Sequence, residues 1–258
     1  MTARSADRPA APNSLGLRAA SPVRTEPSPK RVRVYLGGQV VADTTRALLV
    51  WEVRGYPAFY FPAADVDHDL LVADGDIAQA PGRGDARTFT VQAGHAVAAG
   101  AAQFYDDTEA GELYNHIRFE WDAMDAWFEE DEQVYTHARD PHTRIDVLAS
   151  SRRVRVELEG IVLTDTTSAR LLFETGLPPR CYVPAPHVRT DLLLPSDKVT
   201  QCPYKGTARY WSVRIGDRLH HDVAWSYPAP LPESQKIAGL VAFWNADITI
   251  DGERQHLR

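Results

Sequence analysis

The sequence predicts a mostly β protein made of two copies of one small domain. Two observations predict it: an internal repeat at a constant spacing, and strict alternation of apolar and polar residues within a copy. When Arg31–Leu71 is written over Arg153–Leu193, 21 of 41 positions are identical without a gap. A match of this length indicates a tandem duplication, with a first copy at about 31–136 and a second at 153–258.

Strand patterns are clearest in the second copy. Residues Arg153–Leu158 alternate as a strand with one buried face requires, and Glu159–Gly160 predicts a hairpin turn into Ile161–Thr164. One short helix is expected in each copy; in the second it begins near Pro232, because proline suits a first helical turn, and ends by Gly239. Further strands are expected at 169–174, 180–183, 209–215, 219–227 and 240–250.

Two segments of the sequence fit more than one local structure. In the first copy, Trp121, Met124 and Phe128 follow helical spacing, but the repeat aligns 126–128 with the expected strand at 248–250, so we expect a strand. For the hairpin at Gly216–Asp217, a three-residue loop pairs more apolar residues than a two-residue loop, which favours the three-residue register. That register places Arg209 opposite Trp225 at cation–π distance.

The two segments outside the repeat differ from it in composition. Residues 1–30 hold five of the 18 prolines and few large apolar side chains, which predicts a disordered tail. Residues 137–152 form a charged linker, expected to tie the copies together through arginine–carboxylate pairs. Alternatively, Arg139 and Arg144 reach a substrate carboxylate at the domain boundary. We expect no metal site there, because His137 and His142 lack a regular chelating spacing.

Composition excludes several classes of function. The net charge of −7 offers no basic surface for a phosphate backbone, so nucleic acid is not an expected partner. The sequence lacks a run of about 18–20 apolar residues that would span a membrane, and the N-terminus lacks a secretory signal. We expect a cytoplasmic protein, and the two cysteines exclude a disulfide scaffold.

Several motifs resemble those of the bacterial "domain of unknown function 427" family. They are ETGLPPRCYVP at Glu174–Pro184, CPYKGTARYW at Cys202–Trp211 and DVAWSYP at Asp222–Pro228, and residues His137–Val156 are similar to the linker of the two-copy form common in actinobacteria. The resemblance implies a compact β-tent-like (Mss4-like) domain and no established activity. Zinc-binding relatives of that fold carry two CxxC pairs, which are missing from this sequence, so no structural metal is expected.

Differences between the copies point to a site in the second one. Structural residues should be shared, whereas a site kept in one copy should appear as a difference. The residues that differ are polar or aromatic in the second copy: Cys202, Tyr204, Lys205, Trp211, His221 and Trp225 correspond to Ala80, Gly82, Arg83, Phe89, Ala99 and Gln103.

These differences predict a small-molecule pocket in the second copy, with the first copy degenerate. Trp211, Trp225 and Tyr227 would form its walls, with Lys205 and Arg209 binding the substrate. The alternative is that the aromatic residues simply form the core of that copy.

The catalytic candidates are His221 as general base, Tyr204 as its acid–base partner and Cys202 as nucleophile. Each has a structural alternative: a core histidine, a structural tyrosine and a buried, inert cysteine. Lys205 could bind an anion, form a Schiff base or lie solvated in a turn, whereas Glu174 is shared by both copies, which argues for structure. We expect an enzyme without nucleotide or metal cofactor acting on a small, possibly anionic, organic molecule, or else a non-catalytic binding or sensing module with the same pocket.

Overall fold

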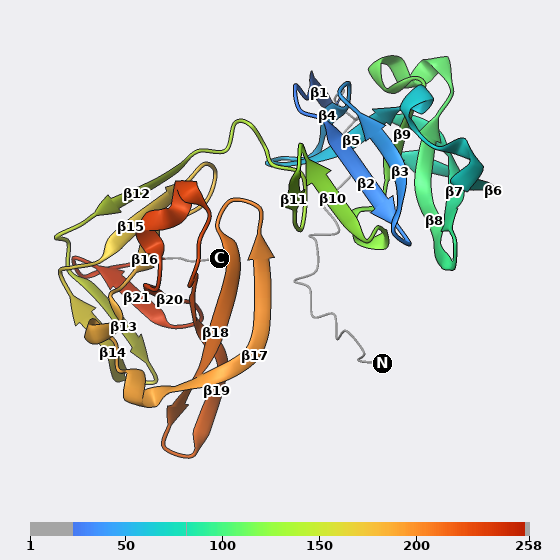
Figure 1. Ribbon diagram of the computed structural model, residues 1–258. Coiled ribbons are helices and arrows are strands. Elements are labelled where there is room, and N and C mark those ends of the chain that lie inside the picture. Colours follow the sequence, from blue (N-terminus) through green and yellow to red (C-terminus); the bar gives the residue numbers. More distant parts are fainter. Residues whose placement is uncertain (1–22, 81, 256–258) are drawn as a thin grey trace.

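The computed structural model describes residues 23–80 and 82–255, and most of the predicted tail lies outside them. Figure 1 shows two β-rich halves joined by the segment that follows β11, as the repeat predicts. Among the described residues, no helix is long and apolar enough to cross a bilayer.

The first copy consists of two antiparallel sheets. The larger contains, in spatial order, β1 (Arg24–Pro27), β4 (Leu48–Val53), β5 (Tyr56–Pro62), β9 (His116–Phe119), β8 (Ala96–Tyr105), β7 (Gly84–Ala93) and β6 (Leu71–Ala80). The smaller contains β11 (Glu132–Val134), β10 (Ala126–Glu129), β2 (Val32–Leu36) and β3 (Gln39–Thr44).

The second copy repeats this order. Its larger layer contains β12 (Ile145–Ala149), β15 (Arg170–Glu174), β16 (Arg180–Tyr182), β20 (Val241–Phe243), β19 (Arg218–Ser226), β18 (Gly206–Ile215) and β17 (Leu193–Cys202), with a bridge from Val183 to Val241 joining β16 to β20. Its smaller sheet contains β14 (Ile161–Thr166), β13 (Val154–Leu158), β21 (Asp247–Ile250) and β22 (Glu253–Arg254). The tandem duplication predicted from the sequence is therefore present in the fold.

The helical segments of both copies are short 3₁₀ turns. The segment predicted as a helix from Pro232 is one of them, and the first copy has a counterpart between β8 and β9. They are η1 (Ala63–Asp65), η2 (His68–Leu70), η3 (Thr108–Leu113), η4 (Trp121–Ala123), η5 (Ala185–His187), η6 (Thr190–Leu192) and η7 (Pro232–Ile237).

Each copy has two hydrophobic clusters, one on each face of its larger sheet. The main cluster fills the space between the sheets, because alternate residues of the strands point inward. The second cluster lies on the opposite face. It contains Val50, Tyr60, Ala86, Tyr105 and Leu113 in the first copy, and Leu172, Tyr182, Ala208, Tyr227 and Ile237, with Val147 and Ala242, in the second.

Both copies begin earlier than the sequence repeat indicated. Arg24–Pro27, within the predicted tail, form β1 and pair with β4, while Ile145–Ala149, within the predicted linker, form β12 and pair with β15. Neither strand was recognised, because none of the four residues of β1 is identical to its counterpart in the second copy. The two strands nevertheless occupy equivalent positions in the fold. Arg24 lies opposite Trp51, and Asp146, at the same spacing as the rest of the repeat, lies opposite Phe173.

The predicted strand at 126–128 is confirmed as part of β10, but its alignment with the second copy differs. β10 pairs Ala126 with Tyr35, and β21 pairs Asp247 with Glu157, the equivalent of Tyr35. Residues 126–128 therefore match 247–249, one position away from the expected alignment. The region 240–250, predicted as one strand, is two strands separated by a turn.

The predicted register of the β18–β19 hairpin is wrong. The loop has two residues, which pairs Val213 with His220. Tyr210, rather than Arg209, lies opposite Trp225. A β-bulge between the two parts of the ladder shifts the phase of β19, and Asp222 adopts φ 56° there. Apolar matching alone could not reveal this shift, since it assumes an uninterrupted ladder.

Linker arginines pair with a carboxylate of each copy: Arg139 approaches Glu132 of the first copy (4.0 Å), and Arg152 pairs with Asp251 of the second (2.6 Å). Other contacts also join the linker to the copies. The Asp140 carboxylate accepts a hydrogen bond from the Trp51 indole (2.9 Å), and the Asp140 backbone N–H donates to the Tyr204 hydroxyl (2.6 Å). His142 contacts Glu26 of β1 (2.8 Å). Arg144 pairs with Asp146 within the same segment. The linker thus bonds to both copies through Asp140.

Candidate functional site

A cavity of about 210 Å³ lies on the outer face of the larger sheet in the second copy, beside its second hydrophobic cluster. Its walls come from strands β15, β16, β18 and β19 and from the segments that follow β15, β17, β19 and β20. Eleven residues line it: Leu172, Glu174, Leu177, Pro178, Arg180, Tyr182, Lys205, Tyr210, Trp225, Tyr227 and Trp244.

Four aromatic rings enclose one side of this cavity. The ring centroid of Trp225 lies 6.4 Å from that of Tyr182, 6.3 Å from that of Tyr210 and 6.4 Å from that of Trp244. Edge-to-face and tilted arrangements at such distances are favourable between aromatic rings. The Trp244 indole donates to the Asp222 carbonyl (2.5 Å), so the backbone at the bulge also positions a wall of the cavity.

An ion pair forms the polar end of the cavity. Lys205 Nζ lies 2.5 Å from Glu174 Oε2, and each side chain is only 11% exposed. Glu174 is the last residue of β15, and Lys205 lies in the turn between β17 and β18. The pair presents a donor and an acceptor side by side against aromatic walls, the arrangement typical of a small-molecule site.

Burial controls protonation around this ion pair. It raises the pKa of the Tyr182 and Tyr227 hydroxyls, which therefore remain protonated at neutral pH. Burial also lowers the pKa of His137, whose ring lies 6.0 Å from that of Tyr204 and 4.9 Å from that of Tyr56. A neutral linker histidine thus stands between tyrosines of the two copies.

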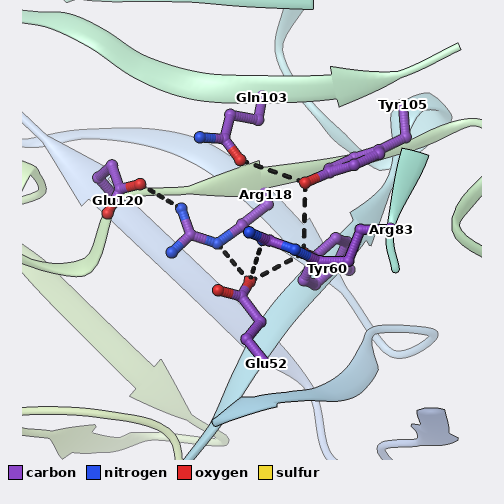
Figure 2. A network of polar contacts seen from close by, with 7 residues as sticks. All are labelled: Glu52, Tyr60, Arg83, Gln103, Tyr105, Arg118 and Glu120. Atoms are coloured by element: carbon purple, nitrogen blue, oxygen red, sulfur yellow. Dashed lines mark hydrogen bonds and ion pairs between the residues drawn. The ribbon is translucent and has the colours of Figure 1, made fainter. Parts of the chain in front are cut away.

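The equivalent position in the first copy is filled by a polar network, which Figure 2 shows. Glu52 Oε1 accepts hydrogen bonds from the Tyr60 hydroxyl (2.8 Å) and from Arg118 Nε (2.6 Å), and lies 2.9 Å from Arg83 Nη1. Arg118 also pairs with Glu120, and its side chain is 14% exposed. One carboxylate therefore holds two guanidinium groups at this place.

Strand register identifies the counterparts of these residues in the second copy. Gln103 lies opposite Arg118 in the first copy, and Trp225 lies opposite Ala242 in the second. Glu120 follows β9 as Trp244 follows β20. Where the first copy has Arg118 and Glu120, the second has an alanine and a ring, and the cavity lies there.

The structure brings together three of the eight predicted site residues. Trp225, Tyr227 and Lys205 line the cavity. Trp211 instead packs against the main cluster, on the other face of β18, and Arg209 is exposed and pairs across the ladder with Ser226. The expected Arg209–Trp225 contact is therefore wrong; the guanidinium over Trp225 belongs to Arg180, 5.9 Å from the ring centroid.

The three catalytic candidates lie outside the cavity lining. His221 is exposed on β19, and the Tyr204 hydroxyl is bonded to the linker at Asp140. Cys202 is a free, half-buried thiol that packs against the second cluster. Their chemical roles remain predictions, and the geometry of the cavity does not depend on them.

Sequence reasoning missed most of the cavity walls. Glu174 was assigned to structure because both copies carry it, although its partners differ between the copies. Tyr210 and Trp244 were overlooked, although the internal repeat aligns Tyr210 with Thr88, a change from a small polar residue to an aromatic one that the comparison of copies was suited to detect.

Two larger depressions lie elsewhere in the second copy. They measure about 410 and 630 Å³, share Thr167 and Ser168, and are more open than the aromatic cavity. Their linings contain no aromatic ring apart from His187. Among the described residues no cluster of three His, Cys, Asp or Glu side chains is placed to hold a metal ion.

Comparisons with known proteins place the chain in a family. A search of curated proteins found no match. A domain of unknown function (DUF427) matches residues 24–130 and 146–255, and these two ranges begin at β1 and β12, the strands that open each copy in the structure. The chain therefore belongs to the DUF427 family and contains two copies of its domain.

Proposed function

We propose that the second copy binds a small organic molecule in the aromatic cavity beside Trp225. One observation carries the proposal: a position closed by ion-paired side chains in the first copy is an aromatic-walled cavity in the second. Concave apolar walls with a few convergent polar groups are the usual form of a small-molecule site. Lys205 and Glu174 supply those groups, and the first copy serves as scaffold.

A second candidate function is a cofactor-independent enzyme that uses acid–base chemistry in the same cavity. The Lys205–Glu174 pair favours it, because a lysine and a carboxylate 2.5 Å apart can exchange a proton with a bound molecule. With His221 exposed and Tyr204 bonded to the linker, this pair is better placed for proton transfer than those two residues.

The binding proposal is tested with tryptophan fluorescence and a fragment library. A molecule in the cavity contacts Trp225 and changes its emission. The Trp225→Ala variant should lose binding of any hit by roughly tenfold or more, because truncating a central aromatic residue removes most of its contact energy. Gln103→Ala, at the equivalent position of the first copy, is the matched control and should bind normally. Hits that bind Trp225→Ala as well as the unaltered protein would refute the proposal.

Turnover separates the two functions. Each confirmed ligand is incubated with the protein and followed by mass spectrometry. Conversion that is lost in Lys205→Met while the ligand still binds would establish the enzyme. Ligands that remain unchanged, with affinity dominated by Trp225, would establish the binding module.

We also infer that each copy has the β-tent (Mss4-like) architecture that the sequence resemblance implies, and the two sheets packed around one core support this inference. An actinobacterial source and a cytoplasmic location are further proposals. The two free thiols support a reducing compartment. The net charge of −7 supports a small molecule rather than nucleic acid as the partner.

A further inference from the structure

In the first copy, a guanidinium group of the chain itself occupies the position equivalent to the cavity. Arg118 extends from β9 toward Glu52, and its planar guanidinium bonds to Glu52 on one side and to Glu120 on the other. Figure 2 shows this group between Glu120 and Glu52, below Gln103 in the view. In the second copy the residue opposite Trp225 is Ala242, which is buried in the second cluster and supplies no guanidinium. The counterparts of the other network residues line the cavity instead.

The counterpart carboxylate of the second copy has fewer donors. Within the described residues, the Glu52 carboxylate accepts from Tyr60 and Arg118 and pairs with Arg83, whereas the Glu174 carboxylate pairs with Lys205 alone. A carboxylate has about four acceptor positions. Glu174 is 11% exposed and lines the cavity, so its remaining acceptor positions are accessible from the space that a ligand would occupy. A ligand with N–H donors would satisfy them as Arg118 satisfies Glu52.

The aromatic walls suit a cation. Lys198 Nζ lies 5.0 Å from the ring centroid of Tyr210 and 5.2 Å from that of Trp244, and the Arg180 guanidinium lies 5.9 Å from that of Trp225. The π faces of aromatic rings attract positive groups, and Lys198 and Arg180 occupy part of these faces. Trp244 stands where the first copy has Glu120, so one partner of the Arg118 guanidinium has been exchanged for a surface that also binds cations.

We propose that the cavity takes a small planar molecule with an amidinium or guanidinium group, whose N–H donors bond to Glu174 in the place that Arg118 occupies against Glu52. This inference rests on the proposed binding function and specifies its ligand class. The neighbouring Lys205 does not prevent it, because Glu52 already holds both Arg83 and Arg118. The cavity of about 210 Å³ exceeds the roughly 150 Å³ that accommodates benzene, so one substituted ring fits.

Benzamidine and benzoate provide the test, because they share a planar shape and carry opposite charges. Isothermal titration calorimetry on the full chain should show benzamidine binding more tightly than benzoate, by roughly tenfold or more. Benzoate is the relevant competitor, since Lys198, Arg180 and Lys205 all lie around the cavity and would favour an anion. Tighter binding of benzoate would overturn the proposal.

Two variants connect binding to the named atoms. Glu174→Gln keeps the shape of the side chain and removes its charge, so it should weaken benzamidine binding by roughly tenfold. Glu52→Gln, its counterpart in the first copy, should leave the affinity unchanged. Ala242→Arg restores the residue of the first copy and should abolish binding by filling the cavity. Affinity that is unchanged in Glu174→Gln would also overturn the proposal.

A further measurement does not depend on the folding of these variants. Arg118→Ala removes the guanidinium from the first copy and should lower the melting temperature, and added methylguanidinium should restore part of it by binding between Glu52 and Glu120. The absence of any rescue would contradict the view that this position selects a guanidinium.

The fragment and benzamidine experiments together distinguish the two proposals. If other fragments bind in a Trp225-dependent way and benzamidine does not, the ligand class is wrong and the binding function stands. If no molecule binds in a Trp225-dependent way, both proposals fail.

Discussion

Asp222 and Gly100 show how one backbone position shapes the site. They are equivalent in the repeat, lie at the bulges of β19 and β8, and adopt φ values of 56° and 61°. Left-handed conformations are unfavourable for most residues, whereas glycine adopts them freely and aspartate tolerates them. Both bulges change the phase of their strands, so that Trp225 and Gln103 point to the outer face of the sheet.

We expect Gly100→Ala to lower the free energy of unfolding by about 1 kcal/mol through backbone strain. A Cβ atom at Gly100 would meet nothing within 4 Å, so no steric clash contributes to the loss. Gly100→Asn should lose less, because asparagine tolerates positive φ. Urea denaturation measures both variants, and equal stabilities for alanine and asparagine would contradict the strain argument.

The two thiols should differ in reactivity. Burial raises the pKa of Cys181 to about 11, so that at pH 8 only roughly one molecule in a thousand carries its thiolate. Cys202 is half-buried. We expect a thiol reagent at pH 8 to label Cys202 first, to lose its early phase in Cys202→Ser and to retain it in Cys181→Ser. Early labelling of Cys181 would contradict its placement in the core.

Asp165 makes the stability of the second copy depend on pH in the acidic range. Its hydrogen bond from Arg153, with support from Arg155, lowers the pKa of the carboxyl to about 2. A lowered pKa stabilises the folded state above the ordinary value of 3.8, and this contribution is lost as the pH falls toward 2. Arg153→Gln should therefore raise the pKa of Asp165 and flatten the dependence of stability on pH in that range. Carboxyl NMR titration checks this, with Arg189→Gln, which affects Asp191, as control.

At the scale of single residues, the copy comparison predicted part of the site. It found Trp225 and Lys205 because their identities change between the copies. It discounted Glu174 because that residue does not change, yet the structure gives Glu52 and Glu174 different surroundings. The function of a shared residue can depend on a neighbour such as Ala242, which lies far away in sequence and becomes adjacent only when β20 pairs with β19.

At the scale of elements, regular strands were predictable and irregular ones were not. β13 alternates without interruption and was found. β17 was missed because Pro195 and the polar residues that follow it resemble a loop, although proline is acceptable on an edge strand and a bulge between Pro195 and Val199 absorbs the irregularity. The bulge of β19 was signalled by Gly100 in the other copy, since glycine within a strand pattern often marks a bulge.

At the scale of the whole molecule, the repeat predicted two copies and missed where each begins. β12 lies at the edge of the larger sheet, and its Val147 belongs to the second hydrophobic cluster, beside Leu172 and Tyr182. The same segment follows directly from Asp140, which bonds to Trp51 and Tyr204. The linker region therefore contributes to the fold of the second copy and to the support of its cavity.

Fragments with different starting points test this assignment. A fragment of residues 136–258 contains β12 and the Asp140–Tyr204 bond, so we expect cooperative thermal unfolding and ligand binding. A fragment of 153–258 lacks β12, which exposes the edge of β15 and one side of the second cluster, and it should melt at a lower temperature or fail to fold. Fragments 23–136 and 31–136 make the same comparison for β1 in the first copy. Circular dichroism measures all four, and equal stability with and without β12 would show that the second copy begins where the sequence repeat first placed it.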